Sequence, residues 1–210
     1  MSFLGLLDYV GVALFAATGA LTASRRQLDV IGFLFLATVT GIGGGTVRDL
    51  ILGVPVFWVV QEAFLTVCVA TAIFVYFTAH FLESRYRLLV WLDAVALAAY
   101  SVFGAHKGLQ VTDSAAIAVV MGMLTGTLGG ILRDVLAGEP SVLLRQEIYV
   151  AAALLGAGSY VATRALGFNP SICAACGVGL ALAMRGGALR FGWTLPAYKS
   201  RPGRPPEDVL

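Results

Sequence analysis

The sequence predicts an all-α integral membrane protein with seven transmembrane helices, arranged as two inverted three-helix repeats plus a seventh helix. Its 210 residues are 59% hydrophobic and only 12% charged, with a mean hydropathy of +0.87. A soluble domain carries roughly twice that charged fraction, so the charges are too few to cover a water-exposed surface. The long apolar runs predict the number of helices, and an internal repeat predicts how they are arranged.

The apolar runs have the length of membrane-spanning helices. A helix needs about 20 apolar residues to cross the hydrocarbon core, and these runs are too long and continuous for barrel strands. The first run lacks a charged segment before it, so we expect a retained span and not a cleaved signal. The expected spans are residues 4–23, 29–52, 58–81, 88–105, 114–137, 147–165 and 171–189.

Composition and motifs argue against several functional classes. The net charge of +2 and the lack of a basic cluster predict no nucleic-acid partner. Cys173 and Cys176 form a C-x-x-C without the flanks of a redox or zinc site, so we expect small buried hydrophobic residues there. No Ser/His/Asp constellation, paired catalytic carboxylate or metal cluster emerges, which predicts a non-enzyme with no cofactor.

The second half of the chain repeats the first. GTLGGILRDVLAGEP at 126–140 echoes GIGGGTVRDLILGVP at 41–55, a constant offset of 85 residues. We expect a first three-helix repeat at 1–85, a second at 86–169, a seventh helix at 170–190, and a disordered cytoplasmic tail at 191–210. Three spans is an odd number, so the second copy enters the membrane inverted, and the functional path is expected at the repeat interface.

The distribution of Lys and Arg predicts the orientation. With the N-terminus outside, nearly all basic loop residues are cytoplasmic, and only Lys107 and Arg164 lie in outer loops. Since cytoplasmic loops carry the excess of Lys and Arg, we expect an outside N-terminus and a cytoplasmic C-terminus.

Glycine clusters mark the second and fifth spans: Gly43, Gly44 and Gly45 in one, Gly129 and Gly130 in the other. Clustered glycines favour a kinked helix whose freed carbonyls line a cavity and coordinate a cation. The alternative is close helix packing through small-xxx-small pairs. A nucleotide-phosphate loop is excluded because Thr46 stands where its third glycine would be.

Charged residues follow the glycines about one helical turn later. A charge inside a span faces the bundle interior, finds a partner and marks a pathway. Helix neighbours do not face each other, so Arg48 is expected to pair with Asp8 and not with Asp49. By the repeat, Arg133 is expected to pair with Asp93 and not with the adjacent Asp134. The alternative is an arginine that snorkels to the headgroups while the carboxylate is a structural anchor.

These features together predict two charged vestibules joined by a narrow, glycine-lined waist. Thr40 and Thr125, just before the glycines, are candidate hydroxyl ligands for an ion; the alternative is a hydroxyl bonded back to its own helix. Phe15 and Tyr100, also 85 residues apart, are candidate plugs, with ordinary core packing as the alternative.

The doubled G-x-G-G-x-x-x-R-D pattern within seven spans resembles the prokaryotic branch of the trimeric intracellular cation (TRIC) channel family, a domain also labelled a bacterial glycine transporter. The match covers about residues 4–190, although Leu128 stands where the first copy has Gly43. The resemblance implies a homotrimer in a bacterial or archaeal inner membrane, with one potassium-conducting pore per subunit and lipid bound in subunit clefts. It also implies that the kinked second and fifth helices line the pore.

Two functions stay open at this point: a passive cation channel, and a secondary carrier of a small solute such as glycine. Inverted repeats with broken helices serve both, so the architecture does not separate them. An arginine near a half-helix N-terminus would suit an amino-acid carboxylate.

Overall fold

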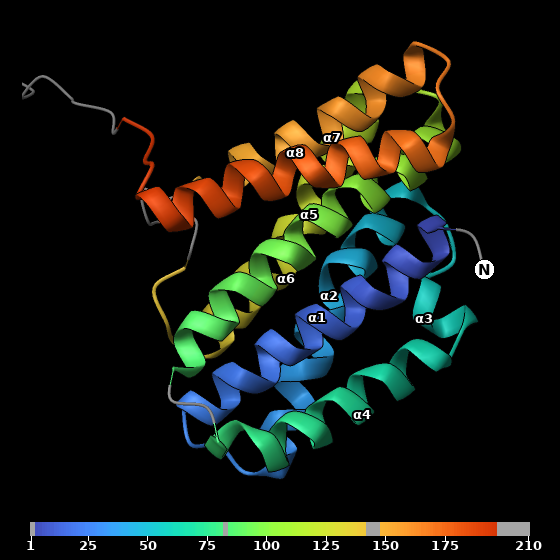
Figure 1. The fold of residues 1–210 in the computed structure, drawn as a ribbon. Coiled ribbons are helices and arrows are strands. Elements are labelled where there is room, and N and C mark those ends of the chain that lie inside the picture. Colours follow the sequence, from blue (N-terminus) through green and yellow to red (C-terminus); the bar gives the residue numbers. More distant parts are fainter. Residues whose placement is uncertain (1–2, 82–83, 142–147, 197–210) are drawn as a thin grey trace, which may run out of the picture.

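The computed structural model describes residues 3–81, 84–141 and 148–196, and this part of the chain is almost entirely helical. Long helices run beside one another in alternating directions, and the N-terminal end lies at the opposite end of the bundle from the end of the last helix (Figure 1). The elements are α1 (Phe3–Arg25), α2 (Val30–Leu52), α3 (Phe57–Val60), α4 (Ala63–Thr78), the 3-10 helix η1 (Ala79–Phe81), α5 (Arg85–Thr112), α6 (Ala115–Leu136), α7 (Val150–Ala165) and α8 (Pro170–Phe191).

Six of these helices are long and apolar enough to cross a membrane: α1, α2, α4 with η1, α5, α6 and α8. The described part of α7 has 16 residues, which is short for a span. The predicted sixth span began at 147, and residues 142–147 lie outside the described residues, as do residues 197–210 of the predicted tail. The all-helical membrane class is confirmed, while the count of seven spans stays a prediction.

The bundle exposes apolar side chains where a soluble protein would present polar ones. Phe35 on α2 and Phe74 and Phe77 on α4 are each more than half exposed. Contiguous exposed apolar surface of this kind marks a membrane or protein contact. The buried residues are mainly apolar as well, but they also include charged side chains, among them Arg48 and Arg133.

Short connections with standard caps join the helices. Asp29 caps α2 by accepting from the Gly32 backbone N–H at 2.8 Å, and Asn169 caps α8 ahead of Pro170. Gly53 ends α2 in the left-handed conformation at φ 65°, which glycine adopts without strain. These capping signals are local to each helix end.

The glycines permit two close helix crossings that recur 85 residues apart. A methyl group on Gly19 of α1 would collide with the Leu36 carbonyl of α2. At the equivalent place in the second half, one on Gly104 of α5 would lie 2.7 Å from the Met121 carbonyl of α6. The same packing of one helix on the next is therefore built twice in this chain.

A third crossing, between α2 and α6, joins the two halves. A methyl group on Gly44 would lie 2.6 Å from the Thr125 carbonyl oxygen, and one on Gly129 would lie 2.7 Å from the Thr40 carbonyl oxygen. Gly44 and Gly129 are equivalent in the repeat, and so are Thr40 and Thr125, so the contact is reciprocal. The helices pass here backbone to backbone, which only glycine allows.

α2 and α6 are not interrupted at their glycines. α2 is helical without a break through Gly43, Gly44 and Gly45, and α6 is helical without a break through Gly129 and Gly130. Glycine keeps its backbone N–H, so the hydrogen-bond ladder can continue through it, whereas proline would break the ladder. The close contacts at Gly44 and Gly129 support the packing alternative that the sequence left open.

Candidate functional site

Two buried groups of charged residues lie on either side of the α2–α6 crossing. Arg48 follows Gly44 by four residues, and Arg133 follows Gly129 by four, about one helical turn or 6 Å in each case. Because α2 and α6 cross antiparallel, the two arginines lie toward opposite ends of the bundle. We call these ends the Arg48 side and the Arg133 side. The Arg133 side is the end of the bundle where α2 and α5 begin, and where α1, α4, α6 and α8 end.

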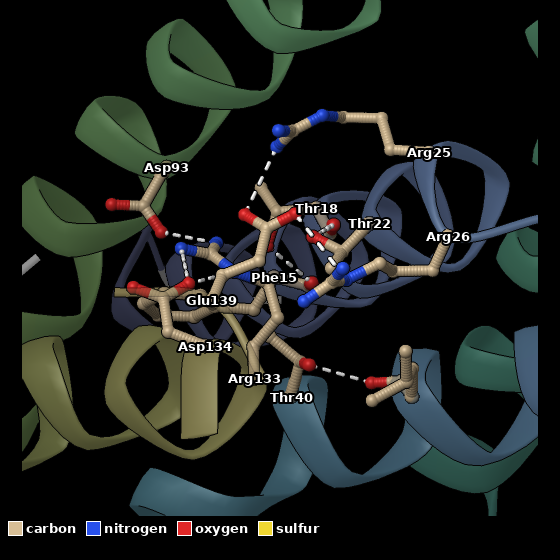
Figure 2. Close-up of polar contacts among 11 residues, drawn as sticks. Phe15, Thr18, Thr22, Arg25, Arg26, Thr40, Asp93, Arg133, Asp134 and Glu139 are labelled. Carbon is tan, nitrogen blue, oxygen red and sulfur yellow. Dashed lines mark hydrogen bonds and ion pairs between the residues drawn. The ribbon is translucent and has the colours of Figure 1, made fainter. Parts of the chain in front are cut away.

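The Arg133 cluster consists of Arg133, Asp134 and Asp93. Arg133 Nη1 donates to Asp93 Oδ1 at 2.7 Å, across from α6 to α5. Its Nη2 and Nε donate to Asp134 Oδ1 at 2.8 and 3.0 Å, so the guanidinium is held between two carboxylates (Figure 2). All three side chains are almost fully buried, and the predicted Asp93–Arg133 pair is confirmed.

The Arg48 cluster consists of Arg48, Asp49, Lys107 and Asp8. Arg48 Nε donates to Asp49 Oδ1 at 2.8 Å, and Lys107 Nζ of α5 lies 2.8 Å from the same oxygen. Asp49 Oδ2 accepts from the Phe57 backbone N–H at 2.9 Å, which fixes the start of α3. Asp49 therefore joins α2, α3 and α5 through one buried carboxylate.

The predicted Asp8–Arg48 pair is absent from the described residues. Asp8 Oδ1 instead accepts from Tyr100 Oη at 3.0 Å. The expectation that adjacent Arg and Asp would not neutralise each other is also wrong, at Arg48–Asp49 and at Arg133–Asp134. The long arginine side chain can reach the carboxylate of the next residue, which the spacing of Cβ atoms alone does not reveal.

Arg48 is the less satisfied of the two buried arginines. Its side chain is 0% exposed, and Nη1 and Nη2 have no hydrogen-bond partner within the described residues. The guanidinium carbon lies 5.7 Å from the centre of the Phe57 ring and 5.3 Å from that of Phe103. Ring faces attract a cation but do not accept its hydrogen bonds in full, so two donors still require a partner.

The waist residues predicted from the sequence lie at the crossing. Thr40 Oγ1 donates to the Leu36 carbonyl and Thr125 Oγ1 to the Met121 carbonyl, which is the alternative that the sequence left open. Both hydroxyl oxygens keep lone pairs as acceptors. Phe15 packs edge-on against Tyr100, with ring centres 5.5 Å apart and both rings buried, so they form part of the core beside Gly129.

Lys107 is the site residue that the sequence analysis missed. It was assigned to an outer loop because the fourth span was expected to end at 105, but α5 continues to Thr112. The available signal was helical spacing, which places Lys107 on the same face of the helix as Asp93, Tyr100 and Gly104.

Arg185 in the second half of α8 is a further buried arginine. Its guanidinium lies 5.2 Å from the centre of the Tyr149 ring, and Nη1 donates to the Ile148 carbonyl at 3.3 Å. Tyr149 Oη lies against Gly130, next to the Arg133 cluster, and has no hydrogen-bond partner among the residues described. A second aromatic–arginine pair therefore borders the second cluster.

Surface contacts of Arg25 and Arg26 with Gly138 and Glu139, which we call the clasp, lie at the Arg133 side. Arg25 Nη1 at the end of α1 lies 3.1 Å from Glu139 Oε2, and Arg26 donates to the Gly138 carbonyl at 2.6 Å. Figure 2 shows both arginines reaching toward Glu139, just beyond α6. The clasp ties the first half of the chain to the second at the rim of the Arg133 cluster.

The described residues hold no group of three His, Cys, Asp or Glu side chains suited to a metal ion. Cys173 is buried as expected, whereas the expectation of burial is wrong for Cys176, which is exposed; neither forms a disulfide within the described residues. Each of the two clusters contains buried charges of both signs, and the close α2–α6 backbone crossing lies between the two clusters.

Comparison with known proteins shows two matches to one family. The sequence model described as "Glycine transporter" matches residues 5–80 and again residues 90–165. The two matches begin 85 residues apart, which is the offset of the internal repeat. Together they cover most of the chain.

Relatives of known sequence and structure match over nearly the whole length. A "UPF0126 membrane protein" of Vibrio cholerae is 40% identical over 94% of this chain and 83% of its own length. The "UPF0126 inner membrane protein YadS" of Escherichia coli is 39% identical over 91% of this chain and 94% of its own. A crystal structure of the TRIC trimeric intracellular cation channel orthologue from Rhodobacter sphaeroides superposes with a TM-score of 0.89 at 47% identity, covering 92% of this chain and all of that one.

Proposed function

The chain belongs to the TRIC family, whose sequence model carries the description glycine transporter, and we propose that it is a channel for monovalent cations, chiefly potassium. The observation that carries this proposal is the likeness to the channel orthologue, at 47% identity over nearly the whole chain. No catalytic chemistry and no cofactor is required for passive conduction.

The proposed pathway runs past the two charged clusters and through the α2–α6 crossing. Charged side chains inside a membrane protein face protein or a water-filled cavity, because lipid cannot solvate them. Arg48 Nη1 and Nη2 need a partner that the described residues do not provide. Water in a pore beside Arg48 would supply it, and Asp8, Asp49, Asp93 and Asp134 would offset the repulsion between the arginines and a permeating cation.

The proposed topology has seven spans, an outside N-terminus and a cytoplasmic C-terminus, with inverted repeats lining the path through α2 and α6. Support comes from the basic residues of the Arg133 side, where Arg25, Arg26, Arg85, Arg87 and Arg190 gather. The Arg48 side has Lys107 and Arg164. Cytoplasmic faces carry the excess of Lys and Arg, so the Arg133 side is assigned to the cytoplasm.

The proposed assembly is a homotrimer with one pore in each subunit. The trimeric name of the Rhodobacter sphaeroides orthologue supports it. The exposed apolar side chains of α2 and α4 then face lipid or the neighbouring subunits. Lipid between subunits is part of the same proposal.

The proposed gate consists of the ion pairs within the two charged clusters. Arg133 is bound by two carboxylates, while Arg48 has one carboxylate and two nitrogens without a partner in the described part of the chain. Displacing Arg133 from Asp93, or Lys107 from Asp49, would widen the path at one end. The arginines then control opening more than they control selectivity.

Planar-bilayer recording of the purified protein under a potassium gradient tests the proposal. Discrete current steps that reverse near the potassium equilibrium potential are expected. A bilayer that stays silent with protein demonstrably inserted contradicts the channel. Parallel recordings with Arg48→Gln and Arg133→Gln connect the currents to the two clusters.

One observation favours a second candidate, a carrier of a small amino acid such as glycine. The unpartnered Nη1 and Nη2 of Arg48 have the forked geometry that binds a carboxylate through two parallel hydrogen bonds. Glycine counterflow into liposomes, lost in Arg48→Gln, would support the carrier. Glycine counterflow no faster than in protein-free liposomes would rule out the carrier.

A further inference from the structure

A pocket outside the proposed pathway lies between the start of α5 and the end of α8. Its volume is about 730 Å³, and it is open to the surrounding medium. The residues that line it are Ser84, Tyr86, Arg87, Val90, Trp91, Leu189 and Arg190. Nothing in the proposed conduction path uses it.

The pocket has a basic mouth. Arg87 on α5 and Arg190 on α8 stand on its two walls, and none of the described residues that line it is acidic. Neither arginine forms an ion pair or hydrogen bond through its side chain in the part of the chain that the structure describes. This contrasts with the neighbouring Arg25 and Arg26, which Glu139 holds in the clasp. Two exposed guanidinium groups facing one pocket attract an anion.

The helix ends reinforce that charge. The pocket includes the N-terminus of the 28-residue α5, where the backbone N–H groups and the helix dipole favour an anion. Ser84 caps this end through its hydroxyl. A phosphate group, with several acceptor oxygens, matches two forked guanidinium groups and a hydroxyl.

The floor of the pocket is apolar and aromatic. Trp91 lies against α8, where a methyl group on Gly186 would meet its ring at 3.4 Å. Val90 and Leu189 extend this floor, while Tyr86 lies at the mouth, under the Arg25 guanidinium at 4.8 Å. Trp and Tyr gather at the headgroup level of membranes, and Trp91 lies about 9 Å deeper along α5 than Arg85.

We propose that this pocket binds the phosphate of an anionic lipid, with the headgroup between Arg87 and Arg190 and the upper acyl chains along Trp91. Basic pockets between transmembrane helices bind such headgroups. A free inorganic phosphate shares the charge but would leave the aromatic floor unused. The proposal is independent of conduction, since it requires only that the helices lie in a membrane.

Native mass spectrometry in mixed micelles of phosphatidylglycerol and phosphatidylcholine tests the site. The wild-type protein should retain phosphatidylglycerol in preference to phosphatidylcholine. Arg87→Gln and Arg190→Gln should each lower that preference about fivefold. Both side chains are exposed and have no ion pair or hydrogen bond to the residues that the structure describes, so we expect both variants to fold, which circular dichroism checks.

Arg164→Gln, at the opposite end of the bundle, is the matched control and should leave the preference unchanged. An equal loss in Arg164→Gln, or no loss in either pocket variant, overturns the proposal. Excess inorganic phosphate should leave the lipid bound. Complete displacement by inorganic phosphate overturns the assignment to a lipid and identifies a free-anion site.

Discussion

Arg133 on α6 and Asp93 on α5 form a buried ion pair, with Nη1 and Oδ1 2.7 Å apart, while their repeat equivalents Arg48 and Asp8 do not. The two halves therefore share a backbone arrangement but differ in how they satisfy their charges. Variants at Asp93 and Arg133 can therefore be compared directly with variants at Asp8 and Arg48.

Asp93→Asn should destabilise the protein more than Asp8→Asn. Removing Asp93 leaves a buried arginine with one of its two carboxylates, and breaking a buried pair costs about 3–5 kcal/mol. Asp8 accepts from Tyr100, and an asparagine carbonyl can still accept that bond, so about 1 kcal/mol is expected there. Thermal unfolding of the purified protein in detergent gives both values. Equal losses would contradict the assigned difference between the clusters.

Arg133→Gln should likewise cost more stability than Arg48→Gln. Loss of Arg133 leaves Asp93 without its cation, whereas Asp49 keeps Lys107 and the Phe57 N–H after Arg48 is lost. Arg48→Gln also removes two nitrogens that lack partners within the described residues. The midpoint of unfolding should fall further in Arg133→Gln. The reverse order would mean that Arg48 has a strong partner in the membrane-embedded protein.

Gly44→Ala and Gly129→Ala should disturb the helix crossing. Each added methyl group would lie within about 3 Å of a backbone carbonyl, which cannot move without shifting a helix. Overpacking of this kind costs about 1–3 kcal/mol. Gly179→Ala on α8, where nothing lies within 4 Å of the new methyl group, is the control. It should be neutral or stabilise slightly, since alanine favours a helix. A harmless Gly44→Ala would refute the tight crossing.

Lys107→Gln should raise the open probability of the proposed channel with little effect on stability. Lys107 is 23% exposed, and a partly exposed ion pair contributes at most about 1 kcal/mol. Its loss frees one side of Asp49 and removes a positive charge at the Arg48 side. Single-channel recording should show longer open times, while Arg164→Gln should match the wild type. Unchanged open times would exclude Lys107 from the gate.

Helix existence and the charged motif were predictable because their causes are local. Apolar run length predicts a span wherever it occurs, and caps such as Asp29 and Gly53 mark the ends without reference to other helices. The constant offset of the G-G-x-x-R-D pattern pointed to both clusters and to the equivalence of Gly44 and Gly129.

Partner choice was less predictable because it depends on side-chain reach across a packed interface. The Asp93–Arg133 pair was expected, but Arg48 turned back to Asp49, and Lys107 arrived from a helix longer than its apolar run. The glycines were ambiguous for a similar reason. A glycine in a helix permits a bend or a close neighbour, and only the position of the neighbouring carbonyl distinguishes them.

The sequence by itself determined that this protein lies in a membrane as a helical bundle, that its halves are copies, and that each copy carries a buried arginine beside glycines. Those properties follow from hydropathy and from residue identity at a fixed spacing. Tertiary structure decided that α2 and α6 cross without interruption and that two equivalent arginines meet different partners. The reason is physical: burial compels each charge to find a partner, but packing geometry determines which partners are within reach.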